Sequence, residues 1–287
     1  MVGDDTPGAT PDPDGSGAVV PAPVSVVLEP IVYAVGDIHG MDSLLDDLLL
    51  QIEADAARRG RPVKVVFLGD LVNRGPDSRQ VVERIMAGPR RPDHSWLTVA
   101  GNHEQLMLDA LLPGSPLAFR RWMKKGGRET LRSYGVPPKQ ASLDAALKAV
   151  PREHLVFLAG LPQYHLHGEF LFVHAGVEPG VRLEAQRPQS LLTIRGPFFK
   201  EPHGLPFVVV HGHTPTEGRP LVGPDRIGVD TGAAATGILT ALAIDGETPQ
   251  PRFIQARARP SRAARRQDTR DGDGLVVPTT KPRRRLR

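Results

Sequence analysis

The most informative segment of the sequence is residues 31–40, which read IVYAVGDIHG. Its first five residues are apolar and partly β-branched, which predicts a buried strand that ends at Gly36. Asp37 and His39 follow, and their side chains share one side of an extended backbone because side chains alternate there with a period of two. A helix is expected next, because apolar residues recur at helical spacing at Leu44, Leu45, Leu48, Leu49 and Ile52. The stretch therefore predicts a strand that presents polar ligands at its carboxyl end.

Two further stretches repeat this strand-then-helix pattern. Apolar runs over residues 63–68 and 96–100 end in Gly69-Asp70 and in Gly101-Asn102-His103, and a helical pattern follows each run. The carboxyl ends of such strands meet at one edge of an α/β sheet, where ligands bind. We therefore expect these polar side chains to lie together with Asp37 and His39.

The second half of the chain returns to short strands after a helical stretch. Residues 106–161 are predicted to form a helical insertion that caps the edge of the sheet. Strands are expected over residues 170–173, 207–210, 226–229 and 238–244, of which the first two end in His174 and in His211-Gly212-His213. The lack of long helices between them predicts a second, mostly antiparallel sheet. The expected fold class is α/β, with two mixed sheets packed face to face between flanking helices.

Five strand ends thus carry carboxylate, carboxamide or imidazole groups beside Gly or Ala. A single His at a strand end is more often structural, but five such ends together predict one shared site. These oxygen and nitrogen ligands suit Mg, Mn, Fe or Zn. A central Asp can bridge two ions about 3.5–4 Å apart, the spacing of two-metal hydrolytic sites.

The composition is that of an ordinary globular protein, with 40% hydrophobic and 24% charged residues. The chain has no Cys, which excludes thiolate ligands and disulfides. It shows no run of about 18 apolar residues and no basic-then-apolar leader. We therefore expect a cytoplasmic protein without a membrane partner.

The two ends of the chain differ from its middle. Residues 1–30 are rich in Pro, Gly and Asp and are expected to form a disordered extension. Residues 252–287 carry 11 Arg and 1 Lys against 3 Asp, a net charge of +9 in a chain of +4, so residues 1–251 sum to −5. A folded domain is expected over residues 31–253 and a basic, disordered tail over residues 254–287. The alternative for the tail is an arm that binds nucleic acid or an acidic partner.

The motifs at the strand ends resemble those of a known family. GDIHG (36–40), GDLVNRG (69–75), GNHE (101–104), HAG (174–176) and HGHTP (211–215) are similar to the successive motifs of the calcineurin-like metallophosphoesterases. Within that superfamily they resemble the bacterial phosphoprotein phosphatase branch. The resemblance implies a four-layer α-β-β-α fold and two divalent metal ions, with Mn²⁺ as the expected ion and Fe or Zn as alternatives.

The resemblance also implies a role for each matching residue. Asp37 and His39 would hold the first ion, Asp70 would bridge both ions, and the second ion would be completed by Asn102, His174 and His213. Phosphate oxygens would be held by Arg74 and Arg195, and His103 would protonate the leaving group. The implied reaction is direct attack on phosphorus by a hydroxide shared by the two ions.

One position departs from the family pattern. Asn73 replaces the second Asp of the usual GDxVDRG motif, which in the family pairs with the general-acid His. A carboxylate there would raise the pKa of His103, whereas Asn73 is expected to accept a hydrogen bond without supplying charge. The bacterial symmetrical diadenosine tetraphosphate hydrolases resemble this chain in lacking that Asp.

The function expected from the sequence is hydrolysis of phosphoproteins or phosphopeptides, as a metal-dependent protein serine/threonine phosphatase, with phosphotyrosine as a further candidate substrate. The alternative, which Asn73 supports, is hydrolysis of diadenosine tetraphosphate or another nucleoside polyphosphate. A third interpretation is a protein that binds phosphorylated partners without cleaving them. The presence of all six metal-ligand positions argues against this third interpretation.

Overall fold

The computed structural model describes residues 30–246 and 250–258. The expected N-terminal extension up to residue 29, and the expected basic tail after residue 258, lie outside the described residues.

The first of two five-stranded sheets has the strand order β10-β9-β1-β2-β3. β1 (Ile31–Val35), β2 (Val63–Phe67) and β3 (Ser95–Thr98) are parallel, and they alternate with α1 (Asp42–Arg59) and α2 (Ser78–Ala87). β9 (Ile238–Ile244) pairs antiparallel with β1, and β10 (Arg252–Arg257) pairs antiparallel with β9. The expectation that residues 238–244 belong to the second sheet is therefore wrong. A short apolar strand pattern specifies a buried strand but not the sheet that it joins.

The second sheet has the strand order β4-β5-β6-β8-β7. Its strands are β4 (Tyr164–His167), β5 (Phe170–Val173), β6 (Val208–His211), β7 (Leu221–Val222) and β8 (Arg226–Gly228). β5, β6 and β8 are parallel, and only the outer strands run antiparallel. The predicted, mostly antiparallel arrangement is wrong because the segment between β5 and β6 contains three short helices, η3 (Leu183–Ala185), α8 (Pro188–Thr193) and α9 (Gly196–Lys200). These give the connection the length that a parallel crossover needs.

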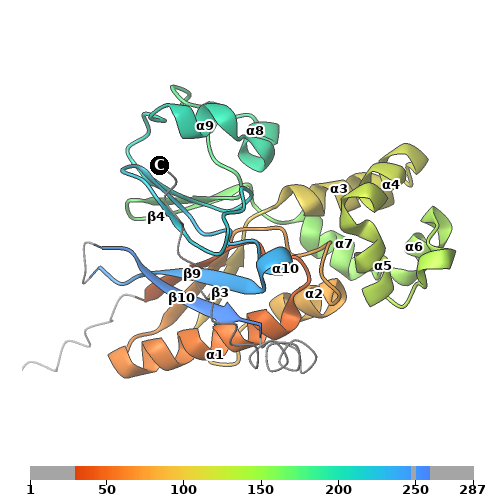
Figure 1. The fold of residues 1–287 in the computed structure, drawn as a ribbon, viewed down its shortest axis with the longest axis horizontal. Coiled ribbons are helices and arrows are strands. Elements are labelled where there is room, and N and C mark those ends of the chain that lie inside the picture. The colour runs from red at the N-terminus through yellow and green to blue at the C-terminus, as the bar shows by residue number, and fades with distance from the viewer. Residues whose placement is uncertain (1–29, 247–249, 259–287) are drawn as a thin grey trace, which may run out of the picture.

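The two sheets pack face to face with helices on both outer sides, as Figure 1 shows with α1 below and α8 and α9 above. Alternation along β1 explains this arrangement: Val32 and Ala34 join the apolar layer between the sheets, whereas Ile31, Tyr33 and Val35 face the helices. Phe198 of α9 packs in a third apolar cluster on the outside of the second sheet. The predicted fold class, two packed mixed sheets flanked by helices, is confirmed.

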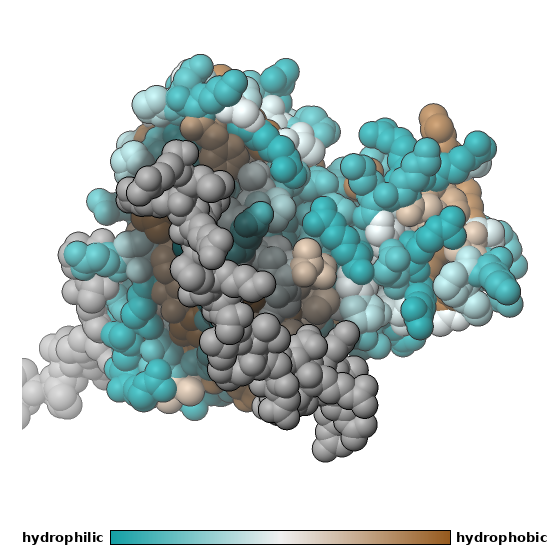
Figure 2. All heavy atoms as spheres, in the orientation of Figure 1, coloured by the Kyte–Doolittle hydropathy of each residue, from teal (hydrophilic) through white to brown (hydrophobic). Residues whose placement is uncertain are grey.

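A lobe of helices projects from one end of the sheets (Figure 1). It consists of α3 (Asn102–Leu111), α4 (Pro116–Trp122), a π-helical turn η1 (Met123–Gly127), α5 (Arg128–Ser133), η2 (Pro138–Gln140), α6 (Leu143–Ala149) and α7 (Arg152–Ala159). Figure 2 shows the lobe as mainly hydrophilic, with apolar atoms gathered at its outer end. A further short helix, α10 (Ala233–Thr236), precedes β9.

The described domain extends past the expected boundary at residue 253, because β10 runs to Arg257. Arg252 explains why this basic stretch is part of the domain. Its guanidinium lies 2.9 Å from Asp55 of α1 and 3.0 Å from Asp245, so both carboxylates hold the start of β10 in place.

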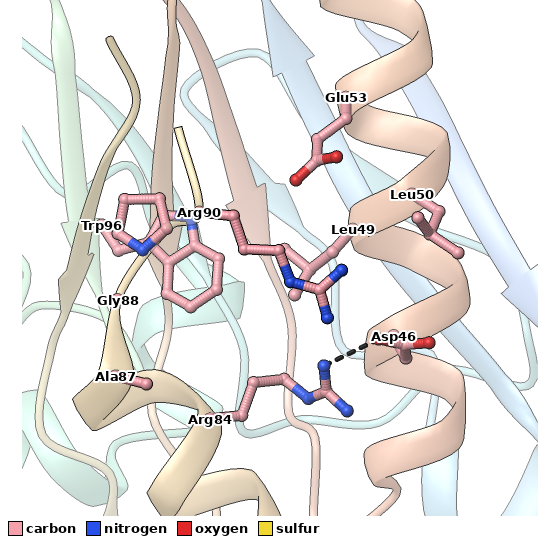
Figure 3. Close-up of a pocket in the computed structure, with 10 residues that line it drawn as sticks. Asp46, Leu49, Leu50, Glu53, Arg84, Ala87, Gly88, Arg90 and Trp96 are labelled. Atoms are coloured by element: carbon pink, nitrogen blue, oxygen red, sulfur yellow. Dashed lines mark hydrogen bonds and ion pairs between the residues drawn. The ribbon is translucent and has the colours of Figure 1, made fainter. Parts of the chain in front are cut away.

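A pocket of about 390 Å³ lies between α1 and the α2–β3 connection (Figure 3). Its lining includes Glu53, Arg90 and Trp96, and Arg84 at its edge is paired with Asp46 at 2.7 Å. None of its lining residues is a predicted site residue. Within the described ranges, no helix has the length and apolar character needed to cross a bilayer.

Candidate metal centre

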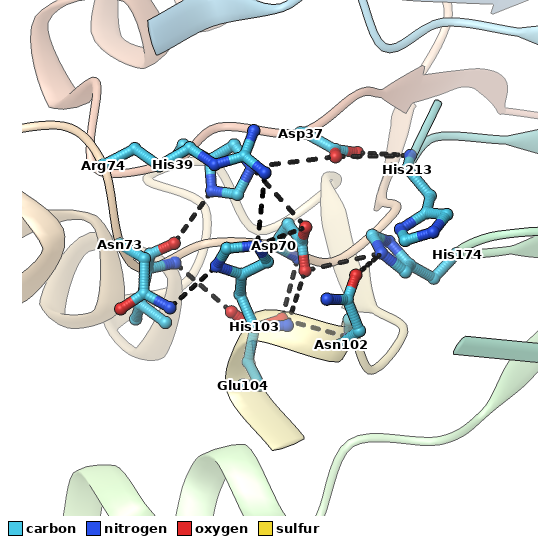
Figure 4. A network of polar contacts seen from close by, with 12 residues as sticks. Asp37, His39, Asp70, Asn73, Arg74, Asn102, His103, Glu104, His174 and His213 are labelled. Atoms are coloured by element: carbon cyan, nitrogen blue, oxygen red, sulfur yellow. Dashed lines mark hydrogen bonds and ion pairs between the residues drawn. The ribbon is translucent and has the colours of Figure 1, made fainter. Parts of the chain in front are cut away.

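The strand ends bring the predicted site residues into one cluster (Figure 4). Asp37 and His39 follow β1, Asp70 follows β2, and His174 and His213 follow β5 and β6 of the second sheet. Asn102 lies at the first position of α3. The site therefore lies where the carboxyl ends of strands from both sheets meet, as expected for a ligand site of this fold class.

Backbone strain is concentrated at these residues. Among the described residues, the non-glycine residues with positive φ are His39 (48°), Asp70 (52°), Asn73 (73°), Arg74 (69°) and His213 (63°). Each such conformation costs on the order of 1–3 kcal/mol and persists only where its surroundings enforce it. All five positions are predicted site residues, so the strain singles out this loop cluster as the candidate functional site.

Two motif glycines allow the buried carboxylates to lie where they do. A Cβ atom on Gly212 would overlap Oδ1 of Asp37, and a Cβ atom on Gly101 would overlap the backbone nitrogen of Asp70. Any larger residue at either position would displace a carboxylate of the site.

His39 has the geometry of a metal ligand. Its Nδ1 donates to the carbonyl of Val72 at 2.9 Å, which leaves the lone pair on Nε2. This Nε2 atom is buried without a hydrogen-bond partner, and it lies 3.5 Å from Asp70 Oδ2 and 3.9 Å from Asp37 Oδ2. A buried lone pair facing two carboxylates is unfavourable unless a cation joins them, so these residues fit a divalent ion.

His174 points to a second ion position. Its Nδ1 donates to the carbonyl of Leu68 at 2.7 Å, so Nε2 is again an acceptor. This Nε2 lies 2.9 Å from Oδ1 of Asn102 and 3.4 Å from Oδ1 of Asp70. Three acceptor atoms converge with no proton between them, which is the arrangement of ligands around one cation.

Asp70 is common to two groups of candidate ligands. In one group it lies with His39 and His103, and in the other with His174 and His213; within each group the ligand atoms lie within 4.8 Å of one another. The described residues could therefore hold two ions that share Asp70.

The electrostatics of the cluster also favour cations. Burial raises the pKa of Asp37 and Asp70 well above the usual range, with further contributions from Asp230 and Glu104 respectively. Burial lowers the pKa of His39 to about 3 and that of His213 to about 4. The imidazoles are therefore neutral ligands at physiological pH, whereas the carboxylates need a nearby positive charge to ionise fully.

Asn73 lies between His103 and the helical lobe. Its Oδ1 accepts hydrogen bonds from Trp122 Nε1 and Thr130 Oγ1, both at 2.8 Å. An indole N–H can only donate, so this contact fixes the orientation of the amide. Nδ2 then donates to Nδ1 of His103 at 2.8 Å. The expectation that Asn73 accepts a hydrogen bond from His103 is wrong, because the acceptor oxygen is already used by the lobe.

His103 is consequently held as a neutral ring with its proton on Nε2. Burial, with the nearby His39 and Arg74, lowers the pKa of His103 to about 2. Arg74 Nη2 lies 3.3 Å from Nε2, but the single lone pair of the ring is taken by Asn73. Figure 4 shows Arg74 above His103, where the guanidinium reaches toward the cluster.

Arg195 lies on the opposite side, against His213. Its Nε donates to His213 Nε2 at 3.2 Å and its Nη2 donates to the His213 carbonyl at 3.0 Å. Ion binding through His213 Nε2 and this hydrogen bond exclude each other, because both use the same lone pair.

A family model described as calcineurin-like phosphoesterase matches residues 31–238. The chain belongs to the calcineurin-like phosphoesterase family. This family is metal-dependent, in agreement with the Asp and His groups of the site.

Several curated relatives of this phosphoesterase share the name symmetrical bis(5'-nucleosyl)-tetraphosphatase. The protein from Dechloromonas aromatica (strain RCB) is 32% identical over 175 residues, covering 59% of this chain and 53% of its own length. The protein from Paracidovorax citrulli (strain AAC00-1) is 35% identical over 157 residues, covering 54% and 47%. The phosphoesterase thus spans about half the length of the curated relatives it matches.

A crystal structure of a protein assigned as a diadenosine tetraphosphatase has the same fold. It aligns with a TM-score of 0.55 and 24% identity, over 80% of this phosphoesterase and 97% of that chain. At this identity the likeness supports the fold alone.

Glu104 of the phosphoesterase is a site residue that the sequence interpretation missed. Its buried carboxylate accepts hydrogen bonds from the backbone N–H groups of Asp70 (2.7 Å), Leu71 (2.8 Å), Val72 (3.2 Å) and Gly101 (3.0 Å). These four bonds fix the strained loop that presents Asp70 and Asn73. The available signal was its place in the GNHE motif, directly after His103.

Asp230 was also left outside the predicted site. It is buried, accepts a hydrogen bond from the Gly232 N–H at 2.9 Å, and its nearby negative charge helps to raise the pKa of Asp37. Like most of the predicted ligands it follows an apolar strand, and like His174 it has a Gly two residues later, in VDTG. That shared pattern was the signal for placing it beside the site.

Proposed function

We propose that this phosphoesterase hydrolyses nucleoside polyphosphates, with bis(5'-nucleosyl) tetraphosphates as the first candidates. The names of its curated relatives support this substrate class. The observation that carries the proposal is the hydrogen bond from Asn73 to His103, because it bears on the kind of leaving group that the site can expel.

The leaving oxygen of a Ser or Thr phosphoester is a basic alkoxide, and protonating it contributes about 10²–10⁴-fold to the rate. A His supplies that proton only when both ring nitrogens carry hydrogen. A proton on His103 Nδ1 would face the Nδ2 donor of Asn73, and the amide cannot turn because Trp122 and Thr130 both donate to its oxygen. His103 is therefore a poor general acid.

A phosphoanhydride needs much less help. Its leaving group is itself a phosphate, whose oxygen is weakly basic and departs without a proton. The Nε2–H of His103 donates a hydrogen bond to that oxygen, which stabilises its charge without transferring the proton. Asn73 thus fits a polyphosphate substrate better than a phosphoserine substrate.

The roles of the other residues follow from their positions in the site. We assign the two ions to the six predicted ligands: Asp37, His39, Asp70, Asn102, His174 and His213. Bound divalent ions would activate water as the nucleophile, and Mn²⁺ is the proposed ion, with Fe or Zn as alternatives for the same oxygen and nitrogen donors. Arg74, and Arg195 when released from His213, hold the phosphate oxygens.

The first expectation from the sequence, a phosphoprotein phosphatase, has weaker support. It shares the metal ligands and both Arg residues with the polyphosphate proposal. It differs in needing a proton for the leaving alkoxide, which the Asn73–His103 pair disfavours.

The proposal is tested by incubating the manganese-loaded protein with diadenosine tetraphosphate and separating the nucleotide products by ion-exchange chromatography. We expect turnover to ADP, which is symmetrical cleavage. The Asp70→Asn variant is the matched control and should release no nucleotide, because it removes the shared carboxylate. No product from the wild-type protein, under conditions where it hydrolyses a phosphopeptide, would contradict the proposal.

A further inference from the structure

A dense group of positive charges lies in the lobe at the junction of α4, the π-helical turn and α5. Five of the nine residues 120–128 are basic, and none of the nine is acidic. All five side chains are exposed and have no hydrogen-bond or ion-pair partner among the described residues: Arg120, Arg121, Lys124, Lys125 and Arg128. We call this group the basic segment.

Several other helical cations of this chain are paired, in contrast to the basic segment. Arg84 of α2 binds Asp42 at 2.7 Å, Lys148 of α6 binds Asp144 at 2.8 Å, and Arg79 of α2 binds Glu83 at 2.7 Å. Residues 1–251 sum to a charge of −5, so the basic segment is not part of a generally positive surface. Its charges are available to an anion from outside the chain.

The basic segment is attached to the Asn73–Arg74 loop of the candidate site on both sides of its two lysines. Before them, Trp122 Nε1 donates to Asn73 at 2.8 Å. After them, the carbonyl of Gly126 accepts the backbone N–H of Arg74 at 3.4 Å. Lys124 and Lys125 therefore lie in the chain between two contacts with the loop that carries Arg74.

The backbone is distorted where the second contact forms. Lys125 has φ −112° and Gly126 has φ +96°, so the helix is interrupted there. A Cβ atom on Gly126 would lie 2.6 Å from the Arg74 nitrogen, which means that only glycine allows so close an approach. Interruptions of this π-helical kind occur often at functional sites.

We propose that Lys124 and Lys125, together with Arg128, bind the phosphate groups of the substrate that lie beyond the group under attack. This inference rests on the proposed function, because only a polyphosphate carries such groups. Bound ions, with Arg74, would compensate the charge at the attacked phosphorus, and the remaining phosphates need cations of their own. Lysine suits this task because its ammonium is a point charge on a flexible stem that can follow a mobile chain of phosphates.

The test is the Lys124→Ala/Lys125→Ala double variant of the full chain. We expect KM for diadenosine tetraphosphate to rise about 10-fold, a modest change because these side chains are exposed to solvent. The effect on kcat should be smaller, because the lysines bind phosphates away from the reacting one. The KM should also become less sensitive to salt, because screening acts on the charges that were removed. The matched control is Lys139→Ala/Lys148→Ala, which removes equal charge from exposed positions of the same lobe and should leave KM unchanged.

A second readout separates this inference from the proposed function. Tripolyphosphate is used as a competitive inhibitor of p-nitrophenyl phosphate hydrolysis, at a constant concentration of free Mn²⁺. We expect its inhibition constant to rise about 10-fold in the double variant, whereas that of inorganic phosphate changes much less. This measurement does not require the protein to cleave a dinucleotide.

The outcomes are distinct. If the wild-type protein cleaves diadenosine tetraphosphate but neither its KM nor the tripolyphosphate inhibition changes in the double variant, the inference is wrong and the proposed function stands. If the wild-type protein does not cleave the dinucleotide, the proposed function is wrong, and the inhibition constants still decide whether the lysines bind polyphosphate. A loss confined to acidic phosphopeptides would assign the basic segment to a protein substrate and contradict the inference.

Discussion

Asn73 donates a hydrogen bond from Nδ2 to Nδ1 of His103 over 2.8 Å. The direction of this bond is set by Trp122 and Thr130, which donate to the amide oxygen from the helical lobe. The lobe therefore determines which nitrogen of His103 carries the proton. A general acid would require both nitrogens to be protonated, so this relationship limits the leaving groups that the enzyme can expel without help.

The tautomer of His103 can be measured directly by ¹⁵N NMR of the imidazole nitrogens. In the metal-free or zinc-loaded protein near neutral pH, we expect Nδ1 to be unprotonated and Nε2 to carry the hydrogen. The Asn73→Ala variant should lose this preference, because nothing then donates to Nδ1. Protonation of Nδ1 in the wild-type ring would show that the amide is turned the other way.

Asn73→Asp should change which substrates are cleaved well. A carboxylate at this position accepts a hydrogen bond from Nδ1 and stabilises the charged ring, so it raises the pKa of His103. We expect the rate on a phosphoserine peptide to rise about 10-fold or more, which is a part of the contribution that a full general acid makes. The rate on p-nitrophenyl phosphate, whose leaving group needs little protonation, should change far less. An unchanged ratio of the two rates, with an unchanged pH profile, would refute the role assigned to Asn73.

Glu104→Gln should destabilise the fold and weaken the metal centre. The variant replaces one carboxylate oxygen with an NH₂ group. Each oxygen accepts two backbone N–H groups, Oε2 those of Asp70 and Gly101 and Oε1 those of Leu71 and Val72, so one of these pairs would face a donor. We expect a loss of about 2 kcal/mol or more in the free energy of unfolding, measured in urea. Glu129→Gln, at an exposed position of α5, is the control and should stay within about 0.5 kcal/mol of the wild type. Equal effects of the two variants would mean that Glu104 does not hold the loop.

Metal binding should raise the melting temperature, and this increase should grow as the pH rises above about 4. In the metal-free fold the raised pKa of Asp37 and Asp70 lowers stability as pH rises above about 4. The lowered pKa of His213, about 4, acts oppositely, since stability is lost as pH falls below about 6.5. Both kinds of group bind an ion only when deprotonated, so metal affinity rises with pH.

This prediction is checked by thermal unfolding with Mn²⁺ and with a chelator at each pH. The Asp70→Asn variant should show a much smaller increase, because it weakens both ligand groups. An increase that is larger at low pH would contradict the assignment of these residues as ligands.

The candidate metal centre could be predicted from the sequence because most of its residues belong to a local pattern, in which an apolar strand ends in a polar side chain beside a small residue. Asp37 and His39 need only the ten residues around them to be recognised. The fold class follows from the same repeated pattern. These features depend on short-range order, which the sequence shows directly.

The remaining features depend on contacts between distant parts of the chain. Trp122 lies 49 positions from Asn73, and its identity as a buried apolar residue gives no indication that its indole nitrogen orients the amide. The pairing of β9 with β1 joins residues more than 200 positions apart, so the strand pattern alone did not place it in the first sheet. Glu104 acts through backbone N–H groups, whose positions only the folded loop defines.

The most direct test of the account is a competition between two substrates in one reaction. Manganese-loaded protein is given diadenosine tetraphosphate and a phosphoserine peptide together, and the ratio of their kcat/KM values is taken from the rates of disappearance. Because His103 is a poor general acid, we expect the dinucleotide to be preferred by about 100-fold or more. A ratio near one, or a preference for the phosphoserine peptide, would contradict the account.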